Sequence, residues 1–425
     1  MPARRLPVIP DLKQLRHQAK DLLRAIRAAE PDALADLAEF HPRRPEPSSV
    51  KLADAQLTLA RSYGAATWTR LVQSCDLIDA IWEDDTDRVR ALVLSNPDLL
   101  HENAGVGNSN WGPPLSYAAN VGRDEIIEML GSLGATDLEH AIGRALLQGR
   151  LDTARKLHRM MGSPKPPAGS LGGPAYTLKP DATALLFEWG AEMVDERGRA
   201  MPPVDVVLGT DSRSPERKHR ILELYAEHGF VYPDTPMMAL HRGRIDLLER
   251  HIERDSSILE RTFAYAEIYP PELGCQIPEP GLYDEFLPRT PLGGTTLLHV
   301  CVEFDELEIA RWLLARGMSP NVRAAVDVNG FGGHTPLHNV VVCYANFWRN
   351  FTGGWPGTQK PDNGEFARLL LEHGADPEAR ASFRLNDRGT PLDIRNVTPF
   401  AWGEAFPIKL VVSQASMREL TRPRS

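Results

Sequence analysis

Residues 295–299 read T-T-L-L-H and residues 334–338 read H-T-P-L-H, and each motif opens one copy of a longer pattern. The first copy continues with E-I-A-R-W-L-L-A-R-G over 308–317, and the second with E-F-A-R-L-L-L-E-H-G-A-D-P over 365–377. In each copy apolar residues recur at helical spacing after a Thr-led turn, and a glycine follows the second apolar segment. The pattern predicts a repeated unit of two short helices.

Two short helices cannot bury their apolar faces alone, so such units must stack on their neighbours. The pattern resembles the ankyrin repeat in its T-P-L-H turn, in the Leu-Leu pair of its second helix and in the closing G-A-D. The resemblance implies an all-α ankyrin-repeat solenoid of about eight to nine helix-turn-helix repeats. It assigns a structural role in the repeat turns to Thr296, His299, Thr335, His338 and, in the last repeat, Thr390.

Degenerate repeats are expected before this segment, because second-helix patterns recur through the chain. Three of them follow a turn of the type Gly-Arg-x-Asp or Gly-Arg-Asp, which predicts a chain reversal at the glycine and an aspartate that caps the next helix. The predicted second helices are Asp87–Leu94, Asp124–Leu130, Asp152–Met160, Ala182–Trp189, Lys218–Ala226 and Asp246–Ile252.

The first 75 residues predict a helical cap. Leu12 to Ile26 form an amphipathic stripe that Asp11 can cap, and further helical patterns run from Asp32 to Phe40, from Val50 to Tyr63 and from Thr67. Their order is similar to the helical leader of some bacterial ankyrin-repeat proteins. A terminal repeat exposes an apolar face, so this segment is expected to shield it.

The remaining boundaries follow from where the repeats weaken or are interrupted. In the last repeat, Gly389–Asp393 is the expected turn, and Pro399 and Pro407 break its helix. Lys409 to Leu420 is expected to form a closing helix. The expected parts are a cap at 1–75, degenerate repeats at 76–265, an acidic proline-rich insertion at 266–294, well-formed repeats at 295–403 with an aromatic insertion at 344–363, and a C-terminal capping helix and tail at 404–425.

Insertions carry the main functional signal. Five aromatics lie within twelve residues of the aromatic insertion at 344–363, whereas aromatics make up 7% of the whole chain. Aromatic and arginine side chains on loops commonly dominate binding interfaces, although this cluster could equally pack internally. The expected partner-binding residues are Trp111, Tyr283, Phe286, Arg323, Phe331, Tyr344, Phe347, Trp348, Arg349, Phe351, Trp355 and Trp402.

Composition narrows the class of protein. Hydrophobic residues at 42% and charged residues at 25% are ordinary for a folded soluble chain. No apolar run approaches the roughly 20 residues that span a bilayer, and Met1–Leu6 lacks a secretory pattern, so a cytoplasmic location without membrane contact is expected.

The net charge of −9 makes nucleic acid an unfavourable partner. Four scattered cysteines indicate neither a disulfide framework nor a zinc site.

Two further groups of residues could carry chemistry, and each also has a structural explanation. His334 and His338 have metal-ligand spacing, but in the ankyrin turn the second imidazole is expected to bond the backbone of a neighbouring turn. Glu272, Asp284 and Glu285 could supply an acid and a base, yet a solvated acidic loop explains them as well. The sequence therefore predicts no metal, no cofactor and no catalytic residue.

Two functions remain from the sequence. The first is a protein-interaction scaffold that binds its partner through the concave face, the finger loops and the aromatic insertions. The alternative is an enzyme or small-molecule-binding protein whose insertions form a pocket over the concave groove. A closed pocket with converging carboxylates would favour chemistry, and an open aromatic surface would favour partner binding.

Overall fold

A computed structural model describes residues 4–107, 110–195, 197–210, 212–276, 289–345, 363–387 and 390–422, with side chains omitted at 386–391. The chain forms two compact units, Met1–Pro166 and Pro167–Ser425. Within the described ranges, no helix combines the length and the apolar character needed to cross a bilayer.

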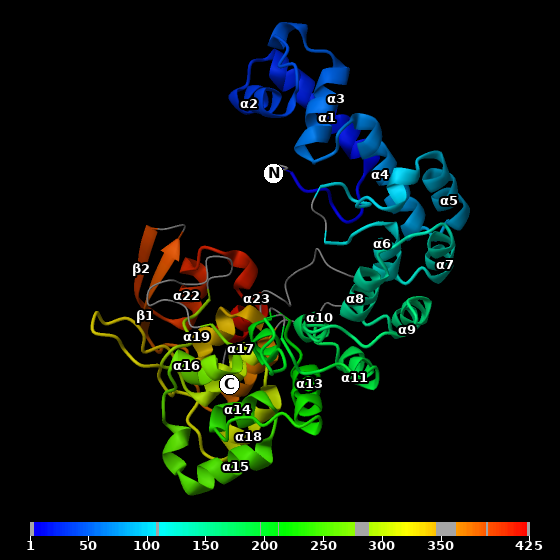
Figure 1. Cartoon of the computed structure of the whole chain (residues 1–425). Coiled ribbons are helices and arrows are strands. Elements are labelled where there is room, and N and C mark those ends of the chain that lie inside the picture. Colours follow the sequence, from blue (N-terminus) through cyan, green and yellow to red (C-terminus); the bar gives the residue numbers. More distant parts are fainter. Residues whose placement is uncertain are drawn as a thin grey trace. The chain divides into compact units, whose positions relative to one another are not determined.

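The first unit is helical throughout. Its helices are α1 (Leu12–Arg27), α2 (Pro31–Phe40), α3 (Leu52–Ser62), α4 (Trp68–Trp82), α5 (Thr86–Ser95), α6 (Pro114–Val121), α7 (Asp124–Ser132), α8 (Leu138–Gln148) and α9 (Leu151–Met160), with 3₁₀ turns at Pro47–Ser49 and Pro97–Leu100. Helix α3 packs against α1, α2 and α4, and α6 packs between α4 and α8 (Figure 1). The N-terminal helices thus form one core that leads into the stacked pairs.

The sequence anticipates this core because the apolar stripe of α1 is the buried face. Leu15, Ala19 and Ile26 are buried together with residues of α3 and α4. Asp11 caps α1 as expected, since its carboxylate accepts hydrogen bonds from the backbone N–H groups of Lys13 and Gln14 at 2.7 and 3.1 Å.

The second unit adds one hairpin to its helices. Its helices are α10 (Gly172–Tyr176), α11 (Pro180–Glu188), α12 (Val204–Gly209), α13 (Pro215–Glu227), α14 (Pro236–His241), α15 (Ile245–Arg254), α16 (Tyr265–Ile268), α17 (Leu297–Phe304), α18 (Leu307–Ala315), α19 (Pro336–Val341), α21 (Gly364–Glu372), α22 (Pro399–Ala405) and α23 (Gln414–Thr421). Strands β1 (Ala381–Asp387) and β2 (Thr390–Val397) pair antiparallel, and 3₁₀ turns lie at Ser256–Leu259, Pro271–Leu273 and Lys409–Val411.

Helix pairs follow one another in both units, as the ankyrin pattern predicts. Every predicted second helix is present, as α5, α7, α9, α11, α13 and α15. First helices stack on first helices, for example α14 on α17 and α17 on α19. Among the described residues the pairs are α4–α5, α6–α7, α8–α9, α10–α11, α12–α13, α14–α15, α17–α18 and α19–α21. The expected all-α repeat fold is therefore confirmed, with the hairpin as an addition.

The expected caps of the second helices are wrong in detail. The cap positions of α7, α9 and α15 are Arg123, Arg150 and Arg244, none of which makes a side-chain cap bond. The following aspartates lie in the first turn, where a carboxylate favours the positive end of the helix dipole. Asp124 also accepts a hydrogen bond from Thr153 of the next pair at 2.8 Å.

The last repeat turn was placed wrongly. Thr390, expected to open a helix, begins strand β2. Residues 392–395 alternate between side chains packed on the core and exposed ones, which is the period of a strand. The helix opens instead at Thr398, whose hydroxyl accepts from the N–H of Ala401 at 3.2 Å, and Pro399 is the first residue of α22 rather than its breaker.

The closing segment is also shorter than expected. Lys409–Val411 forms a 3₁₀ turn, and α23 begins only at Gln414, where Ser413 caps it by accepting from the N–H of Ser416. Helix α23 packs against α21 and α19 and so covers the end of the stack. The capping role of this segment stays a prediction.

Candidate binding site

Main-chain hydrogen bonds link the loops that connect successive repeats in the second unit. The N–H of Phe263 donates to Thr295 and the N–H of Gly294 donates back to Phe263, at 2.7 and 2.8 Å. Ala325 then donates to Gly294 at 2.7 Å. The N–H of Gly332, beyond the turn of the same loop, donates to Ser382 in β1 at 2.7 Å. We call these linked loop segments the finger ladder.

The finger hairpin, residues 324–334, forms the central part of this ladder. Its turn is fixed by Asp327, whose carboxylate accepts from the N–H groups of Asn329 and Phe331, both at 2.8 Å. Two apolar side chains project into solvent beside this turn: Val326 is 61% exposed and Val328 is 100% exposed. A rigid loop therefore presents an apolar tip.

Arginine side chains surround the finger hairpin. Phe331 is buried, and the guanidinium carbons of Arg384 and Arg395 lie 4.3 and 4.1 Å from its ring centroid. Arg384 also forms a two-pronged ion pair with Asp393 at 2.7 and 2.9 Å. Arg323 donates to the backbone carbonyls of Gly333 and Arg380 and so ties the hairpin to the next segment. Arginines therefore lie around the tip of the hairpin, and Asp393 pairs with two of them, Arg384 and Arg395.

The histidines of the two repeat turns, His299 and His338, bond to the threonine of their own turn and to a backbone carbonyl further along the chain. Nδ1 of His299 lies 2.9 Å from Oγ1 of Thr296, and its Nε2 lies 3.1 Å from the carbonyl oxygen of His334. His338 makes the same pair of contacts with Thr335 and with the carbonyl of Val397. Burial lowers the pKa of His299 to about 3 and that of His338 to about 4, so both rings are neutral at pH 7.

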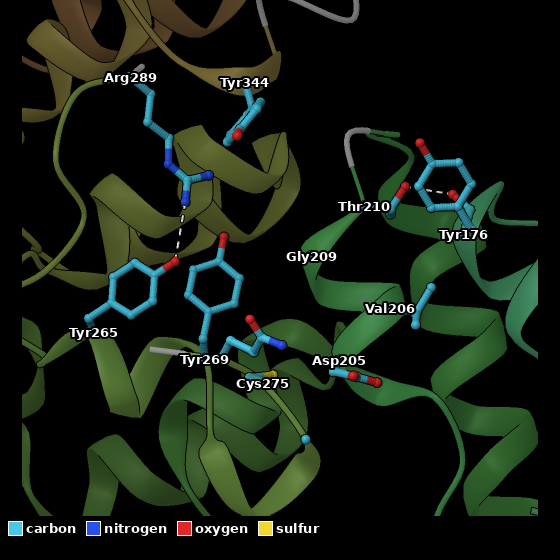
Figure 2. A pocket seen from close by; sticks show the side chains of 12 residues that line it. Tyr176, Asp205, Val206, Gly209, Thr210, Tyr265, Tyr269, Cys275, Arg289 and Tyr344 are labelled. Atoms are coloured by element: carbon cyan, nitrogen blue, oxygen red, sulfur yellow. Dashed lines mark hydrogen bonds between the residues drawn. The ribbon is translucent and has the colours of Figure 1, made fainter. Parts of the chain in front are cut away.

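The second feature of this unit is a cavity of about 460 Å³. Figure 2 shows Arg289 with Tyr265, Tyr269 and Tyr344 around it, and Asp205 apart from them across the cavity. The side chains come from α12, from α16 and the turn after it, and from the segments at 289 and 344. The complete lining is Tyr176, Asp205, Val206, Gly209, Thr210, Tyr265, Tyr269, Gly274, Cys275, Gln276, Arg289 and Tyr344. We call it the tyrosine pocket.

Arg289 is the cation of the tyrosine pocket. Its Nη1 donates to Oε1 of Glu303 at 2.7 Å, and its Nη2 donates to the Tyr265 hydroxyl at 3.4 Å. The guanidinium carbon lies 4.3 Å from the ring centroid of Tyr344 and 5.9 Å from that of Tyr269. These aromatic faces hold the guanidinium in position, since a cation above an aromatic ring is attracted by its quadrupole.

Glu303 is fully buried behind the pocket. Its Oε1 also accepts from Nη2 of Arg213 at 3.2 Å, so one carboxylate oxygen serves two guanidinium groups. The backbone carbonyl of Glu303 accepts from Nε of Arg213 at 2.9 Å. The arrangement fixes Arg289 from the protein side while 14% of its side chain stays exposed.

A second buried ion pair lies three residues further along the chain, at Glu306. Nζ of Lys218 is 2.6 Å and Nε2 of His219 is 2.8 Å from Oε1 of Glu306. Lys218 is also 4.6 Å from the ring centroid of Phe304. Burial lowers the pKa of Lys218. Burial also opposes the charge on Glu306, but Lys218 and His219 more than compensate and keep its pKa below the ordinary value.

The opposite wall of the pocket favours neutral groups. Burial raises the pKa of the Asp205 carboxyl above its ordinary value, and it raises the pKa of the Cys275 thiol to about 12. The thiol is therefore protonated at pH 7, which argues against its acting as a nucleophile. Asp205 is the only carboxylate among the described lining residues.

Two of the expected partner-binding residues are buried in packing instead. Trp402 is fully buried, stacks on Phe383 with 3.7 Å between ring centroids, and donates to Thr290 at 2.9 Å. Trp111 is buried against Tyr117 with 4.6 Å between centroids. The expectation of partner contact is wrong for both, because side chains at these sites fill the core that the repeats need.

The other expected residues divide into three groups. Arg323 directly precedes the finger hairpin and bonds to it, and Phe331 lies within it, where its buried ring contacts arginines rather than facing solvent. Tyr344 lines the tyrosine pocket. Outside the described residues lie Tyr283, Phe286, Phe347, Trp348, Arg349, Phe351 and Trp355, so the aromatic insertion stays a prediction.

Sequence reasoning missed the pocket residues Arg289 and Glu303. One signal was available, because Glu303 is the only charged residue in the apolar sequence L-L-H-V-C-V-E-F of α17. A buried carboxylate of this kind requires a cationic partner. Among the described residues, no three His, Cys, Asp or Glu side chains gather in a way that could hold a metal ion.

Comparison with known proteins identifies the repeat. Residues 293–325 match the family model described as Ankyrin repeat. Among solved structures, the chain is similar to the ankyrin repeat domain of Bcl-3, a member of the IkappaB protein family, at 17% identity over 68% of this chain and 98% of that chain, with a TM-score of 0.24. It is also similar to the human ASB11 ankyrin repeat domain, at 17% identity over 73% and 99% of the two chains, with a TM-score of 0.24. TM-scores this low carry no argument about partners. A comparison with curated proteins found no match.

Proposed function

We propose that this ankyrin-repeat protein binds a protein partner through its finger ladder, with the finger hairpin as the main contact. Ankyrin repeats are protein-interaction modules, which gives the general class of function. The observation that carries the specific proposal is the exposed pair Val326 and Val328 on a loop held by main-chain hydrogen bonds. An apolar tip on a preordered loop loses little conformational entropy on binding.

The chemistry of the partner follows from the surroundings of the tip. Arg384 and Arg395 lie beside the hairpin, and Arg323 and Arg380 follow along the ladder. Guanidinium groups pair well with carboxylates, and complementary charge speeds association. We therefore expect a partner segment in which apolar residues alternate with aspartate or glutamate.

The aromatic insertion and the concave face extend this proposal. Aromatic loop residues would add contact area next to the fingers, as the sequence composition of 344–363 suggests. An enzymatic function has less support. Acid and base catalysis by paired carboxylates needs two of them at a set separation, whereas the described lining of the tyrosine pocket contains Asp205 alone.

Peptide display against the full chain tests the proposal. Peptides selected on the wild type should be rich in acidic residues next to Val, Leu or Ile. They should lose binding to the double variant Val326→Ser and Val328→Ser. Val231→Ser is the matched control, since Val231 is 86% exposed in another loop of the same unit.

Two outcomes of the peptide display would contradict the proposal. Selected peptides that bind the double variant as well as the wild type would place the interface elsewhere. Peptides without acidic enrichment, or unaffected by Arg384→Gln with Arg395→Gln, would remove the electrostatic part of the proposal. Circular dichroism of each variant checks that the fold is retained.

A further inference from the structure

We propose that the tyrosine pocket is a binding site for a small molecule that carries one carboxylate on a flat apolar body. The site is independent of the finger ladder. Its volume of about 460 Å³ lies within the range of pockets that enclose small ligands. The carboxylate would bind Arg289, and the flat body would lie along the tyrosine walls.

The cation of the site is held in advance. Glu303 and the ring of Tyr344 fix the guanidinium of Arg289 from two sides. A guanidinium carries five N–H donors, and here two of its nitrogens bond described residues, one of them through a long contact of 3.4 Å to the Tyr265 hydroxyl. Because Arg289 lines the cavity, a carboxylate bound there can approach its guanidinium group.

Glu303 neutralises only part of the positive charge of the two arginines that pair with it. Its Oε1 is shared between Arg289 and Arg213, and its Oε2 is buried without a hydrogen-bond partner among the described residues. A guanidinium that shares its counter-ion retains attraction for a second anion, and low local dielectric strengthens this attraction. The protein therefore orients Arg289 without fully neutralising it.

The far wall limits the charge of the ligand. Asp205 lies across the cavity from Arg289. A dianion such as phosphate would be repelled by this carboxyl whenever Asp205 is ionised, whereas a monoanion can place its charge at Arg289 and its apolar part near Val206 and Cys275. Tyr265 and Tyr269 stack on each other with 4.8 Å between their ring centroids, and together they form an aromatic wall beside Arg289 against which a flat apolar body can pack.

Three probes test the proposal by calorimetry and saturation-transfer NMR on the full chain: benzoate, its neutral analogue benzamide, and inorganic phosphate. We expect saturable binding of benzoate and at least about tenfold weaker binding of both others, since a hydrogen-bonded charge pair is worth roughly that factor or more. Equal binding of benzoate and benzamide, tighter binding of phosphate, or no binding of any probe would overturn the inference.

Variants locate the site. Arg289→Gln should weaken benzoate binding about tenfold or more, and Arg289→Lys should give an intermediate loss because it keeps the charge without the planar fork. Asp205→Asn should bind benzoate at least as tightly as the wild type. Arg250→Gln, at an exposed position of α15, is the control and should bind as the wild type does.

Folding is checked separately, by circular dichroism and by peptide binding at the finger ladder. If Arg289→Gln fails to fold, the benzoate affinity of the wild type is compared with that of Arg289→Lys, which keeps an ion pair with Glu303. A folded Arg289→Gln or Arg289→Lys with unchanged benzoate affinity would refute the assignment of Arg289. A negative result with benzoate would not affect the proposal that the finger ladder binds a protein partner, because the two tests use different variants and different probes.

Discussion

Replacement of Lys218 by methionine should destabilise the second unit more than any surface change. The Lys218 ammonium lies 2.6 Å from Glu306, and the two side chains are only 4% and 2% exposed. Methionine keeps most of the length of the side chain and its packing on Phe304, but it removes the charge. Among the described residues, Glu306 would then keep only the contact with Nε2 of His219, at 2.8 Å.

The expected cost follows from this geometry. Removal of one partner from a buried ion pair costs about 3–5 kcal/mol, because the other charge stays desolvated. Glu306→Gln should cost a similar amount through the unpaired Lys218. The double variant should be less destabilised than the sum of the two by about 2 kcal/mol, since it removes both charges together.

Urea unfolding followed by circular dichroism measures these differences, and hydrogen exchange on peptides from α13 and α18 locates them. Arg220→Met is the control, because Arg220 and Glu227 form an ion pair in which both side chains are about half exposed. It should cost less than about 1 kcal/mol. A Lys218→Met cost equal to that of the control, or strict additivity in the double variant, would refute the assignment of a strong buried pair.

Three further predictions concern the scaffold. Thr398→Ala should cost about 1 kcal/mol in urea unfolding through loss of the α22 cap, and Thr398→Ser should restore it. Gly332→Ala should lower the free energy of unfolding more than Gly317→Ala does, and it should also weaken partner binding. Both glycines have positive φ, but only at Gly332 would a Cβ meet a backbone oxygen, at 2.0 Å. Equal losses of stability in the two variants would contradict this. Stability should fall as the pH drops from 6 to 5, because the histidines at 299 and 338 take up protons only in the unfolded chain: their folded pKa values are about 3 and 4, against an ordinary 6.5. The slope should be about 1 kcal/mol per histidine per pH unit, and it should decrease in His299→Gln; an unchanged slope in that variant would contradict the prediction.

The repeating helices could be predicted because their signals are local. Apolar spacing and a glycine turn lie within a dozen residues, and α5, α7 and α9 appear where that spacing places them. The hairpin was missed for the opposite reason. Gly389-Thr-Pro-Leu matches the repeat turn by letter, but the alternation that follows through Leu392 and Ile394 buries one face of a strand against the C-terminal core.

The tyrosine pocket depends on contacts that sequence spacing does not show. Arg213 and Arg289 are 76 residues apart in numbering, yet both reach the single carboxylate of Glu303. Trp402 shows the converse error, because an aromatic residue in a degenerate repeat looks available for binding until its contacts with Phe383 and Thr290 are known. Burial of a given side chain depends on which segments meet, and that is a property of the tertiary fold.

The finger ladder has a consequence for how this surface can change. Its bonds from Phe263 through Gly294 and Ala325 to Ser382 join backbone atoms only. Side chains at the exposed tips, such as Val328, take no part in holding the loops together. Substitutions there can alter the ligand without disturbing the geometry that presents it, so new specificities can be introduced at the tips one residue at a time.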